Sequence, residues 1–465
     1  MDIRVLELQH VTRDLPNGGF VLVLNTGAVI TPEDEAMLQA LHSRSVGGIR
    51  VHLKTLADKG SERFMDSFYV GYGHKSIGDC GSVTIFIEVV SMLLAKAIQD
   101  WLQYCGQEAS TRYIDFSTQE FIDPIKSARS REILESWRTF YLAAQEPVRA
   151  YLRECFPKKQ EEDAKVYEKA INARSFDILR GFLPAGASTN LSWHTNLRQA
   201  ADHIALLRHH PLIEVQDVAK ALESALQEAC PSSFGHKRYE STEMYRQEWM
   251  REEYYFCGTQ HHNVCPENSI DGSHQRVVLT RNSIDQDSLE EYASRLSKRP
   301  AKTELPKQMA ECGTMQFQFL IDFGSFRDIQ RHRSVIQRMP LLSSKFGMHS
   351  WYLESLPDGI RREAEKLIRH QLGAIDTLPK DKFVRQYYFP MGMCVPCRLT
   401  GDLPALVYVT ELRAQVVVHP TLHEVALEMA DELTAQFGSK GLMLHVDREK
   451  GRFDVRRGLQ DIVRK

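Results

Sequence analysis

The chain lacks any surplus of positive charge, and this absence narrows the classes of function. Its 465 residues carry 58 Lys and Arg against 61 Asp and Glu, a formal net charge of −3. A nucleic-acid-binding protein normally shows a basic surplus, so we expect no nucleic acid among its partners. The 43% hydrophobic and 26% charged residues are those of an ordinary globular protein. The length exceeds what one hydrophobic core usually serves, so we expect two or three domains.

Long apolar runs and signal-peptide features are also missing. The most apolar stretch, 83–97, is interrupted by Glu88 and Lys96 and is too short to cross a bilayer. The first residues, Met1 to Arg4, lead into mixed polar sequence, unlike a signal peptide. Nine cysteines spread over so long a chain suggest no disulfide framework, and a reducing compartment is their natural setting. We therefore expect a cytoplasmic protein without a membrane partner.

Paired metal-ligand motifs are absent as well. Cys257 and Cys265 flank His261 and His262, and Cys394-Val-Pro-Cys397 is a CxxC motif. A structural zinc site needs four ligands at recognisable spacing, and neither group has a matching second pair. We expect no metal, and we interpret the CxxC motif as a turn.

Phosphate-binding capacity is concentrated in Arg331-His332-Arg333, which follows the apolar run 317–326. Guanidinium groups present forked donors that match phosphate oxygens, and a histidine ring can stack or donate. Consecutive side chains on a helix point in different directions, so the three would hold one extended ligand, such as a dinucleotide, better than one small anion. The alternative interpretation of such a tripeptide alone is a solvated basic turn.

Periodicity and capping signals predict a mixture of strands and helices. The chain has a helix start at 31–35, where Thr31 precedes Pro32 and three acidic residues, and a glycine-rich stretch at 69–82. Strands are predicted at 20–25 and 277–280, and helices at 31–41, 130–155, 160–179, 238–255, 288–296 and 422–437, with two more within 193–230.

The order of short sequence words in the first part recurs in the second. The paired words are Leu183-Pro184 with Phe389-Pro390, Thr195-Asn196-Leu197-Arg198 with Thr410-Glu411-Leu412-Arg413, and His210-Pro211 with His419-Pro420. Their spacing of about 205 to 230 residues predicts a duplicated domain rather than a short-period repeat. The segment from about 231 to 270 is the expected boundary between the two copies.

The chain resembles the flavin-dependent thymidylate synthases, the ThyX family. Their signature is Arg-His-Arg, seven residues and then Ser, often within Glu-x-Ser-x-Arg-Tyr. The first half carries 108–113 as Glu-Ala-Ser-Thr-Arg-Tyr, but Asp100-Trp101-Leu102 stands where Arg-His-Arg is expected. The second half carries Arg331-His332-Arg333, and 343–346 matches the later part only loosely. Each half thus keeps what the other has lost.

The resemblance implies an α+β fold of two tandem ThyX-like domains, each a small mixed or antiparallel sheet packed with long helices. The expected boundaries are 1–235 for the first domain, 236–272 for a linker helix and loop, and 273–465 for the second. The two domains would form a pseudo-dimer, and a homodimer of the chain would mimic the family's tetramer. Arg331-His332-Arg333 would then meet Ser110-Thr111-Arg112 in a composite site.

The resemblance also implies the site residues and ligands. The cofactor is FAD, with NADPH and methylenetetrahydrofolate as co-substrates and a pyrimidine mononucleotide as substrate. The residues expected at the cofactor are Arg331, His332, Arg333, Arg413, His419, Glu311, His74, Ser76 and Arg198. The residues expected at the nucleotide are Gln107, Glu108, Ser110, Arg112, Tyr113 and Arg208.

Three functions stay open from the sequence. The first is reductive methylation at C5 of deoxyuridine monophosphate, as the family performs. The second is a related flavoenzyme acting on another pyrimidine nucleotide, favoured by Gly106 and Gln107 near the base. The third is a non-catalytic homologue that binds flavin or nucleotide, favoured by the split signature. Since the flavin would carry the redox chemistry, no catalytic residue is assigned.

Overall fold

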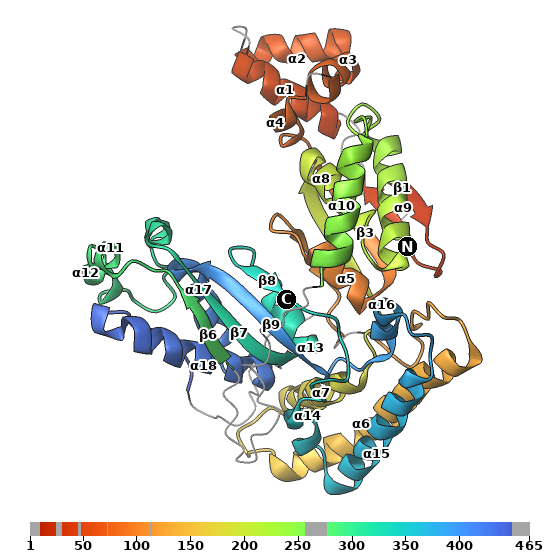
Figure 1. Cartoon of the computed structure of the whole chain (residues 1–465), viewed down its shortest axis with the longest axis vertical. Coiled ribbons are helices and arrows are strands. Elements are labelled where there is room, and N and C mark those ends of the chain that lie inside the picture. Colours follow the sequence, from red (N-terminus) through yellow and green to blue (C-terminus); the bar gives the residue numbers. More distant parts are fainter. Residues whose placement is uncertain are drawn as a thin grey trace. The chain divides into compact units, whose positions relative to one another are not determined.

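The computed structural model describes residues 10–24, 30–44, 48–71, 73–111, 114–255 and 277–448. It confirms an α+β fold with two antiparallel sheets and many helices (Figure 1). The chain divides into two compact units. Unit 1 comprises Met1–Ile114, Gln119–Pro124 and Ala187–Tyr254, and unit 2 comprises Asp115–Thr118, Ile125–Gly186 and Tyr255–Lys465.

The sheet of unit 1 is antiparallel throughout, with strand order β1-β2-β3-β5-β4. Its strands are β1 (His10–Asp14), β2 (Phe20–Leu24), β3 (Ser82–Ser91), β4 (Cys105–Glu108) and β5 (Ser188–Asn196). Alternate residues of β3, such as Val83, Ile85 and Ile87, are buried, as expected of a strand with one face on a core. Helix α9 (Ile213–Ala229) covers β1 and β2 with an apolar stripe that includes Val215, Val218 and Leu222.

The remaining helices of unit 1 form two groups. The first precedes β3 and contains α1 (Pro32–Arg44), α2 (Gly48–Lys59), α3 (Glu62–Phe64), a π-helical segment η2 (Met65–Gly71) and α4 (Lys75–Gly78). The second contains α5 (Met92–Gln99), α8 (Leu197–Leu207) and α10 (Glu240–Glu253). Helix α10 packs against α8, so the helix that we expected to be a linker is part of unit 1.

The sheet of unit 2 has the strand order β6-β7-β9-β8 and is also antiparallel. Its strands are β6 (Val277–Asn282), β7 (Thr314–Asp322), β8 (Ile336–Arg338) and β9 (Cys394–Asp402). Helix α18 (Pro420–Phe437) packs on β6 and β7, and α17 (Leu403–Arg413) packs on α18. Two short helices, α11 (Gln286–Glu290) and α12 (Ala293–Leu296), replace the single helix predicted at 288–296.

Long helices complete unit 2. Helix α6 (Ala128–Cys155) packs against α7 (Ala164–Leu179) and lies beside α15 (Asp358–Asp376) (Figure 1). The shorter elements are η4 (Arg180–Phe182), η6 (Lys307–Cys312), α13 (Phe323–Ile329), α14 (Ser350–Glu354), α16 (Lys382–Arg385), η7 (Gln386–Tyr388) and η8 (Gly438–Lys440). Helices α6 and α7 were expected in the first domain, but they pack with the second half of the chain.

The two sheets share a topology once β1 is set aside. The order β2-β3-β5-β4 in one corresponds to β6-β7-β9-β8 in the other. The two central strands of each sheet run directly into helices, and the last strand residue caps each one. The side chains of Ser91, Asn196, Asp322 and Asp402 accept hydrogen bonds from the first turns of α5, α8, α13 and α17. These caps satisfy backbone N–H groups that a helix start leaves unpaired.

Within unit 2, the segments around Pro184 and Pro390 pair with each other in a reciprocal way. Ala185 N–H donates to the carbonyl of Phe389, and Met391 N–H donates to the carbonyl of Leu183, both at 2.8 Å. Gly186 N–H donates to Tyr387 and Gly392 N–H donates to Gly181, again at 2.8 Å. Each segment makes the same two bonds to the other from equivalent positions, counted from its proline, so the pairing has local two-fold symmetry. These are the Leu-Pro and Phe-Pro words that the sequence had matched.

Two expectations from sequence are wrong in detail. Residues 193–196 end strand β5, so the first of the helices expected within 193–230 begins only at Leu197. Arg198 lies in the first turn of α8, whereas Arg413 ends α17. The tetrapeptides that end in these arginines therefore do not occupy equivalent positions. The two tetrapeptides are similar in sequence because both contain Thr and Leu-Arg, although they lie in different secondary-structure environments.

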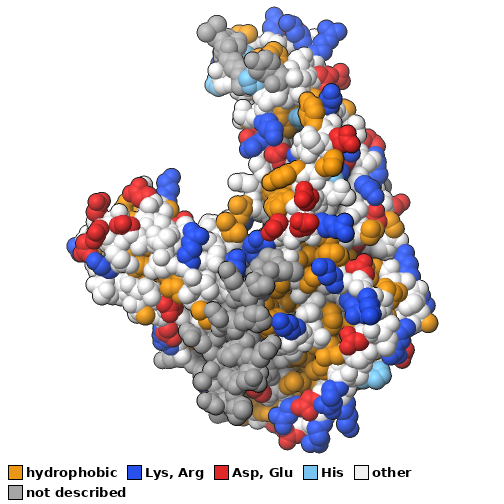
Figure 2. Space-filling view, viewed as in Figure 1, with side chains coloured by type: hydrophobic (Ala, Val, Ile, Leu, Met, Phe, Trp, Pro, Cys, Tyr) orange, Lys and Arg blue, Asp and Glu red, His pale blue; other side chains and the backbone are white. Residues whose placement is uncertain are grey.

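Charges are mixed over the surface of the protein. Figure 2 shows acidic and basic side chains interspersed over the visible face, in keeping with the small net charge. In the parts of the chain that the structure describes, none of the helices combines the length and apolarity needed to cross a membrane.

The tight packing at Gly181 makes a testable prediction. A Cβ at this position would lie 2.5 Å from the fully buried Tyr352 ring, so Gly181→Ala should destabilise unit 2 by about 1–3 kcal/mol. Gly373 lies exposed in α15 with open space around its Cα, so Gly373→Ala should stabilise by about 0.5–1 kcal/mol. Melting temperatures of the two variants measure this contrast, and equal shifts in both would contradict the packing described.

Candidate functional site

Unit 2 contains a cleft of about 510 Å³ built around Arg331-His332-Arg333. Three segments line it: the loop after α13, one side of α17, and the chain at and just before η6. The lining residues are Glu304, Leu305, Lys307, Ala310, Arg331, His332, Arg333, Ser334, Asp402, Pro404, Ala405, Tyr408, Val409, Leu412 and Arg413. The cleft thus brings the tripeptide together with Arg413, and all four residues were expected at the cofactor.

Helix α13 positions the tripeptide. Phe323, Phe326 and Ile329 are buried and fix the helix on the core. The helix ends at Ile329, and its carbonyl accepts a hydrogen bond from His332 N–H at 3.0 Å. The chain turns there, so the His332 side chain is buried while Arg331 and Arg333 are exposed.

His332 is held by Arg413 in a neutral state. Arg413 Nε donates to His332 Nε2 at 2.8 Å, which makes Nε2 the acceptor and leaves the ring proton on Nδ1. A second Arg413 nitrogen donates to the backbone carbonyl of Asp328 at 2.6 Å. Burial, followed by the nearby Arg413 charge, lowers the pKa of His332 to about 3. The His332 ring therefore lines the cleft in a fixed orientation and is uncharged at neutral pH.

Charged side chains behind the cleft are buried, as Arg327 is, or partly buried, as Asp328 is. Burial tends to raise the pKa of Asp328, but Arg180, Arg331 and Arg413 outweigh it and hold that pKa below its usual range. Burial, with Arg331 nearby, lowers the pKa of Arg327 to about 10. A carboxylate among cations stays ionised at neutral pH and fixes the guanidinium groups around it.

The cleft has a basic rim and one aromatic surface. Arg331 lies 3.9 Å from Asp328, a loose ion pair, and Arg333 and Lys307 are exposed without an ion pair within the described residues. Tyr408 is 44% exposed and stands edge-on to His332, with ring centroids 5.9 Å apart. Cations with free donors bind phosphate oxygens, and an exposed ring stacks on a planar group.

Two residues of unit 2 that were expected at the cofactor, Glu311 and His419, do not line this cleft. Glu311 accepts a hydrogen bond from the Tyr292 hydroxyl at 2.8 Å. His419 is buried at the start of α18, where Nε2 contacts the Asp177 carbonyl at 3.2 Å and Nδ1 contacts Thr421 at 2.9 Å. Thr421 in turn donates to the buried Asp322 at 2.6 Å. His419 therefore stabilises the packing of α18 onto α7 in this structure.

The residues expected at the nucleotide lie in unit 1. Gln107 and Glu108 form part of the edge strand β4, and Glu108 accepts from Gln99 at 2.7 Å. Ser110 is exposed just beyond the strand. Arg112 and Tyr113 lie outside the described residues. Because Ser110 and Arg331 belong to different units, the composite site remains a prediction.

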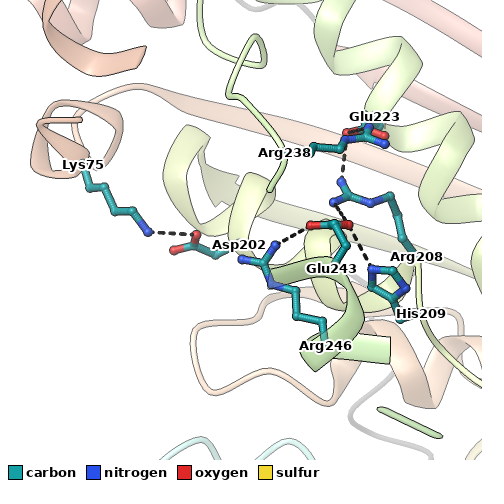
Figure 3. A network of polar contacts seen from close by, with 8 residues as sticks. All are labelled: Lys75, Asp202, Arg208, His209, Glu223, Arg238, Glu243 and Arg246. Carbon is teal, nitrogen blue, oxygen red and sulfur yellow. Dashed lines mark hydrogen bonds and ion pairs between the residues drawn. The ribbon is translucent and has the colours of Figure 1, made fainter. Parts of the chain in front are cut away.

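Unit 1 has its own cleft of about 280 Å³, along α8. It contains Arg198 and Arg208, both expected from sequence, together with Lys75 of α4. His74 and Ser76 flank Lys75 but do not line the cleft. Five of the six lysines and arginines that line this cleft are paired with acids, and Figure 3 shows most of these pairs.

The tripeptide Asp100-Trp101-Leu102 follows α5 as Arg331-His332-Arg333 follows α13. Asp100 pairs with Lys96 at 3.0 Å, and Leu102 is exposed. Trp101 stacks on His203 of α8, with ring centroids 4.7 Å apart, and donates to Gln199 at 3.0 Å. Unit 1 therefore has an aromatic anchor in place of two cations.

Sequence reasoning missed several lining residues. Lys307 and Tyr408 belong to the cleft of unit 2, and Arg238, Glu243 and Arg246 belong to that of unit 1. The spacing of Tyr408, Leu412 and Arg413 on one side of a helix was a usable signal for Tyr408. The others come from segments without a motif, and only folding brings them to the site.

Metal binding receives no support from the described residues, among which no three His, Cys, Asp or Glu side chains are grouped to hold an ion. The Cys257–Cys265 segment lies outside the described residues. Cys394 and Cys397 lie buried on strand β9, rather than in the turn that we had expected.

Fold and cleft together define an α+β protein with a cleft suited to a phosphate-bearing ligand. Residues 28–232 match the family described as thymidylate synthase complementing protein, the ThyX family. The match confirms the resemblance seen in the motifs of the first half. The cleft around Arg331 lies beyond the matched residues.

Three proteins named only as UPF0159 proteins are similar over most of the chain. That of Chlamydia muridarum is 26% identical over 418 residues, covering 80% of this chain and 77% of its own. That of Chlamydia pneumoniae is 26% identical over 420 residues, with 80% and 77% covered. That of Thermoplasma acidophilum is 22% identical over 471 residues, with 84% and 89% covered. These similarities extend well beyond the family match, into the second half.

The neutral state of His332 predicts a specific acid sensitivity. Its pKa of about 3 in the folded protein lies below that of an unfolded histidine, so folding is favoured above pH 6.5 and weakened as the pH falls. At pH 5 the loss from this residue should be roughly 2 kcal/mol. Melting temperatures at pH 7.5 and 5.0 should therefore differ less in His332→Gln than in the wild type. The exposed His370→Gln is the control, and identical pH dependence in all three would refute the assignment.

Proposed function

We propose that the protein is a flavin-dependent thymidylate synthase-like enzyme, which methylates C5 of deoxyuridine monophosphate. The observation that carries the proposal is the cleft of unit 2, where Arg331 and Arg333 are exposed beside a His332 that Arg413 holds neutral. The family match of residues 28–232 supports it independently, from the other half of the chain.

The residues of the cleft fit a flavin dinucleotide. Arg331, Arg333 and Lys307 would bind the pyrophosphate, since they offer cationic donors that are not consumed by close ion pairs in the described chain. The exposed Tyr408 ring would pack against a planar ring of the cofactor. A bound flavin supplies the electron transfer, so the protein has to bind, orient and exclude water rather than provide a nucleophile.

The nucleotide would bind through the segment Gln107–Tyr113 of unit 1. Ser110 is exposed for contact with a phosphate, and Arg112 is the arginine that the family motif associates with it. Glu108 is held by Gln99, which fixes its carboxylate as an acceptor for a ribose hydroxyl or a base N–H.

We also propose that the chain arose by tandem duplication. The matching strand orders and the reciprocal hydrogen bonds around Pro184 and Pro390 support this. Each half then keeps a motif that the other has lost. Two chains in a symmetric homodimer would then supply the four domains of the family's tetramer.

A non-catalytic role is the second candidate. It is favoured by the observation that Trp101 fills the position of a motif residue in unit 1 and packs on His203. A protein with this role would hold flavin or nucleotide without turnover.

The first test is the visible absorbance of the purified protein, followed by titration with FAD. We expect a flavin band that is lost, or an affinity that falls by about a hundredfold, in Arg331→Ala/Arg333→Ala, since two charge-assisted contacts disappear. Arg361→Ala/Arg362→Ala on α15 removes the same charge away from the cleft and should bind FAD normally. No binding in any form would exclude both enzymatic readings.

The assay with deoxyuridine monophosphate, methylenetetrahydrofolate and NADPH then separates the candidates. Formation of thymidylate, reduced in the Arg331→Ala/Arg333→Ala variant, is the expected result. Flavin binding with no product from this nucleotide would replace the proposal with an enzyme acting on a different pyrimidine nucleotide. Flavin binding without turnover of any pyrimidine nucleotide would favour the non-catalytic role.

A further inference from the structure

A buried ion pair between Arg299 and Glu411 joins two of the segments that line the unit 2 cleft. Arg299 is 5% exposed and donates to both carboxylate oxygens of Glu411, to one of them at 3.0 Å. The same guanidinium donates to the carbonyl of Thr303 at 2.6 Å, and Glu304 follows as the first lining residue of that segment. Glu411 belongs to the last turn of α17, which ends with Arg413. The ion pair therefore fixes one wall of the cleft to another.

The segment that follows η8 passes over this ion pair. We call residues 442–448 the strap, and they contain neither helix nor strand. The carbonyl of Met443 accepts a hydrogen bond from Arg299 at 2.9 Å, and His445 N–H donates to Glu411 at 2.8 Å. His445 Nε2 also lies 3.1 Å from the carbonyl of Arg299. Each member of the ion pair therefore also holds the strap.

A second contact of the strap lies at the C-terminal end of α17. Asp447 N–H donates to the carbonyl of Ala414, the residue after Arg413, at 3.0 Å. The Asp447 carboxylate accepts a hydrogen bond from Val416 N–H, also at 3.0 Å. The first of these bonds satisfies a carbonyl that the end of a helix leaves unpaired. The strap thus contacts the residues on both sides of Arg413, since it also binds Glu411.

The orientation of Arg413 matters because this side chain holds His332 in the cleft. Arg413 donates to His332 Nε2 at 2.8 Å and to the carbonyl of Asp328 at 2.6 Å. A side chain that orients a binding group must itself be held to within about 0.5 Å by its surroundings. The strap and the ion pair hold the turn of backbone from which Arg413 projects, so they supply this support.

The ion pair is not part of the architecture that the two units share. Glu411 is the ninth residue after Asp402, which caps α17, and the ninth residue after Asn196, which caps α8, is Ala205. Because Ala205 is buried and uncharged, α8 packs without such a pair at this position. A buried ion pair contributes little net stability compared with well-packed apolar side chains. Its directional bonds are therefore better explained by what they position than by stability.

We propose that Arg299 and Glu411 are positioning residues for the unit 2 cleft, and that the strap holds Arg413 against His332 through them. Loosening the strap releases Arg413 and lowers the affinity of the cleft for its dinucleotide ligand. The identity of that ligand as FAD rests on the proposed function, whereas the link between the strap and His332 does not.

NMR titration of the His332 ring tests this link without any ligand. Burial, followed by the Arg413 charge, lowers the pKa of His332 to about 3, so the ring should stay neutral at pH 5 in the wild type. Glu411→Gln keeps the shape of the side chain but removes its charge. Arg413 should then move away from the ring, and the pKa of His332 should rise. The spectrum of His332→Gln identifies the signal, and an unchanged titration in folded Glu411→Gln would overturn the proposal.

Titration with FAD measures the consequence for binding. Glu411→Gln should bind FAD about tenfold more weakly than the wild type, because a displaced wall loses about one hydrogen bond to the ligand. Glu290→Gln is the matched control, since it breaks an exposed ion pair with Lys440, two residues before the strap, and does not line the cleft. It should bind FAD as the wild type does. Equal affinities in all three proteins would contradict the positioning role, whereas a wild type that binds no FAD would count against the proposed function and leave the His332 titration decisive.

The double variant Arg299→Met/Glu411→Met separates positioning from stability. Replacing a buried ion pair with apolar side chains of similar size often leaves stability unchanged or raises it. The melting temperature should therefore match or exceed that of Glu411→Gln, while FAD binding stays about tenfold weaker than in the wild type and the pKa of His332 stays raised. Recovery of FAD affinity and of the His332 titration together with stability would show a purely structural role and overturn the proposal.

Discussion

The reciprocal hydrogen bonds between residues 181–186 and 387–392 are the constraint on which unit 2 depends. Proline lacks an N–H, so Pro184 and Pro390 can face each other while their neighbours make all four bonds. The pairing fixes the end of α7 to the chain that leads into β9. Arg180 and Asp177 lie just before the first stretch, and their bonds to Ser325 and His419 leave few alternative packings.

That constraint extends to the candidate flavin cleft through buried charge. Arg180, fixed beside Gly181, contributes most to keeping the pKa of Asp328 low. The Asp328 backbone accepts from Arg413, and Arg413 in turn holds His332. A residue from the first half of the chain thus supports the geometry of a motif in the second. Removing one buried charge from such a group leaves its partners uncompensated, which is why the group holds together.

The two clefts lie in units with the same strand order but differ in whether their cations are paired with acids. Both lie beside the helix that follows the last central strand, α8 or α17, and both contain arginines. In unit 2 the rim cations are available to a ligand, whereas in unit 1 shared carboxylates engage them. The difference arises from few residues: Arg-His-Arg against Asp-Trp-Leu after the preceding helix, and the added helix α10. Local charge pairing, rather than fold, separates the two sites.

Periodicity, capping residues and short motifs were sufficient to predict the α+β class and most strands and helices. They also led us to expect Arg331, His332, Arg333 and Arg413 in one site. These depend on local propensity or on side chains close to a motif. The packing of α6 and α7 with the second half, the burial of His419 and the pairing of Glu243 with Arg208 depend on contacts between distant segments. No local pattern encodes such contacts, because the free energy of burying a side chain depends on what the rest of the chain places around it. The sequence by itself thus determined which residue types the candidate sites contain. The tertiary structure decided which of these side chains are exposed to a ligand and which are paired with the protein's own charges, because pairing depends on segments that are distant in the chain.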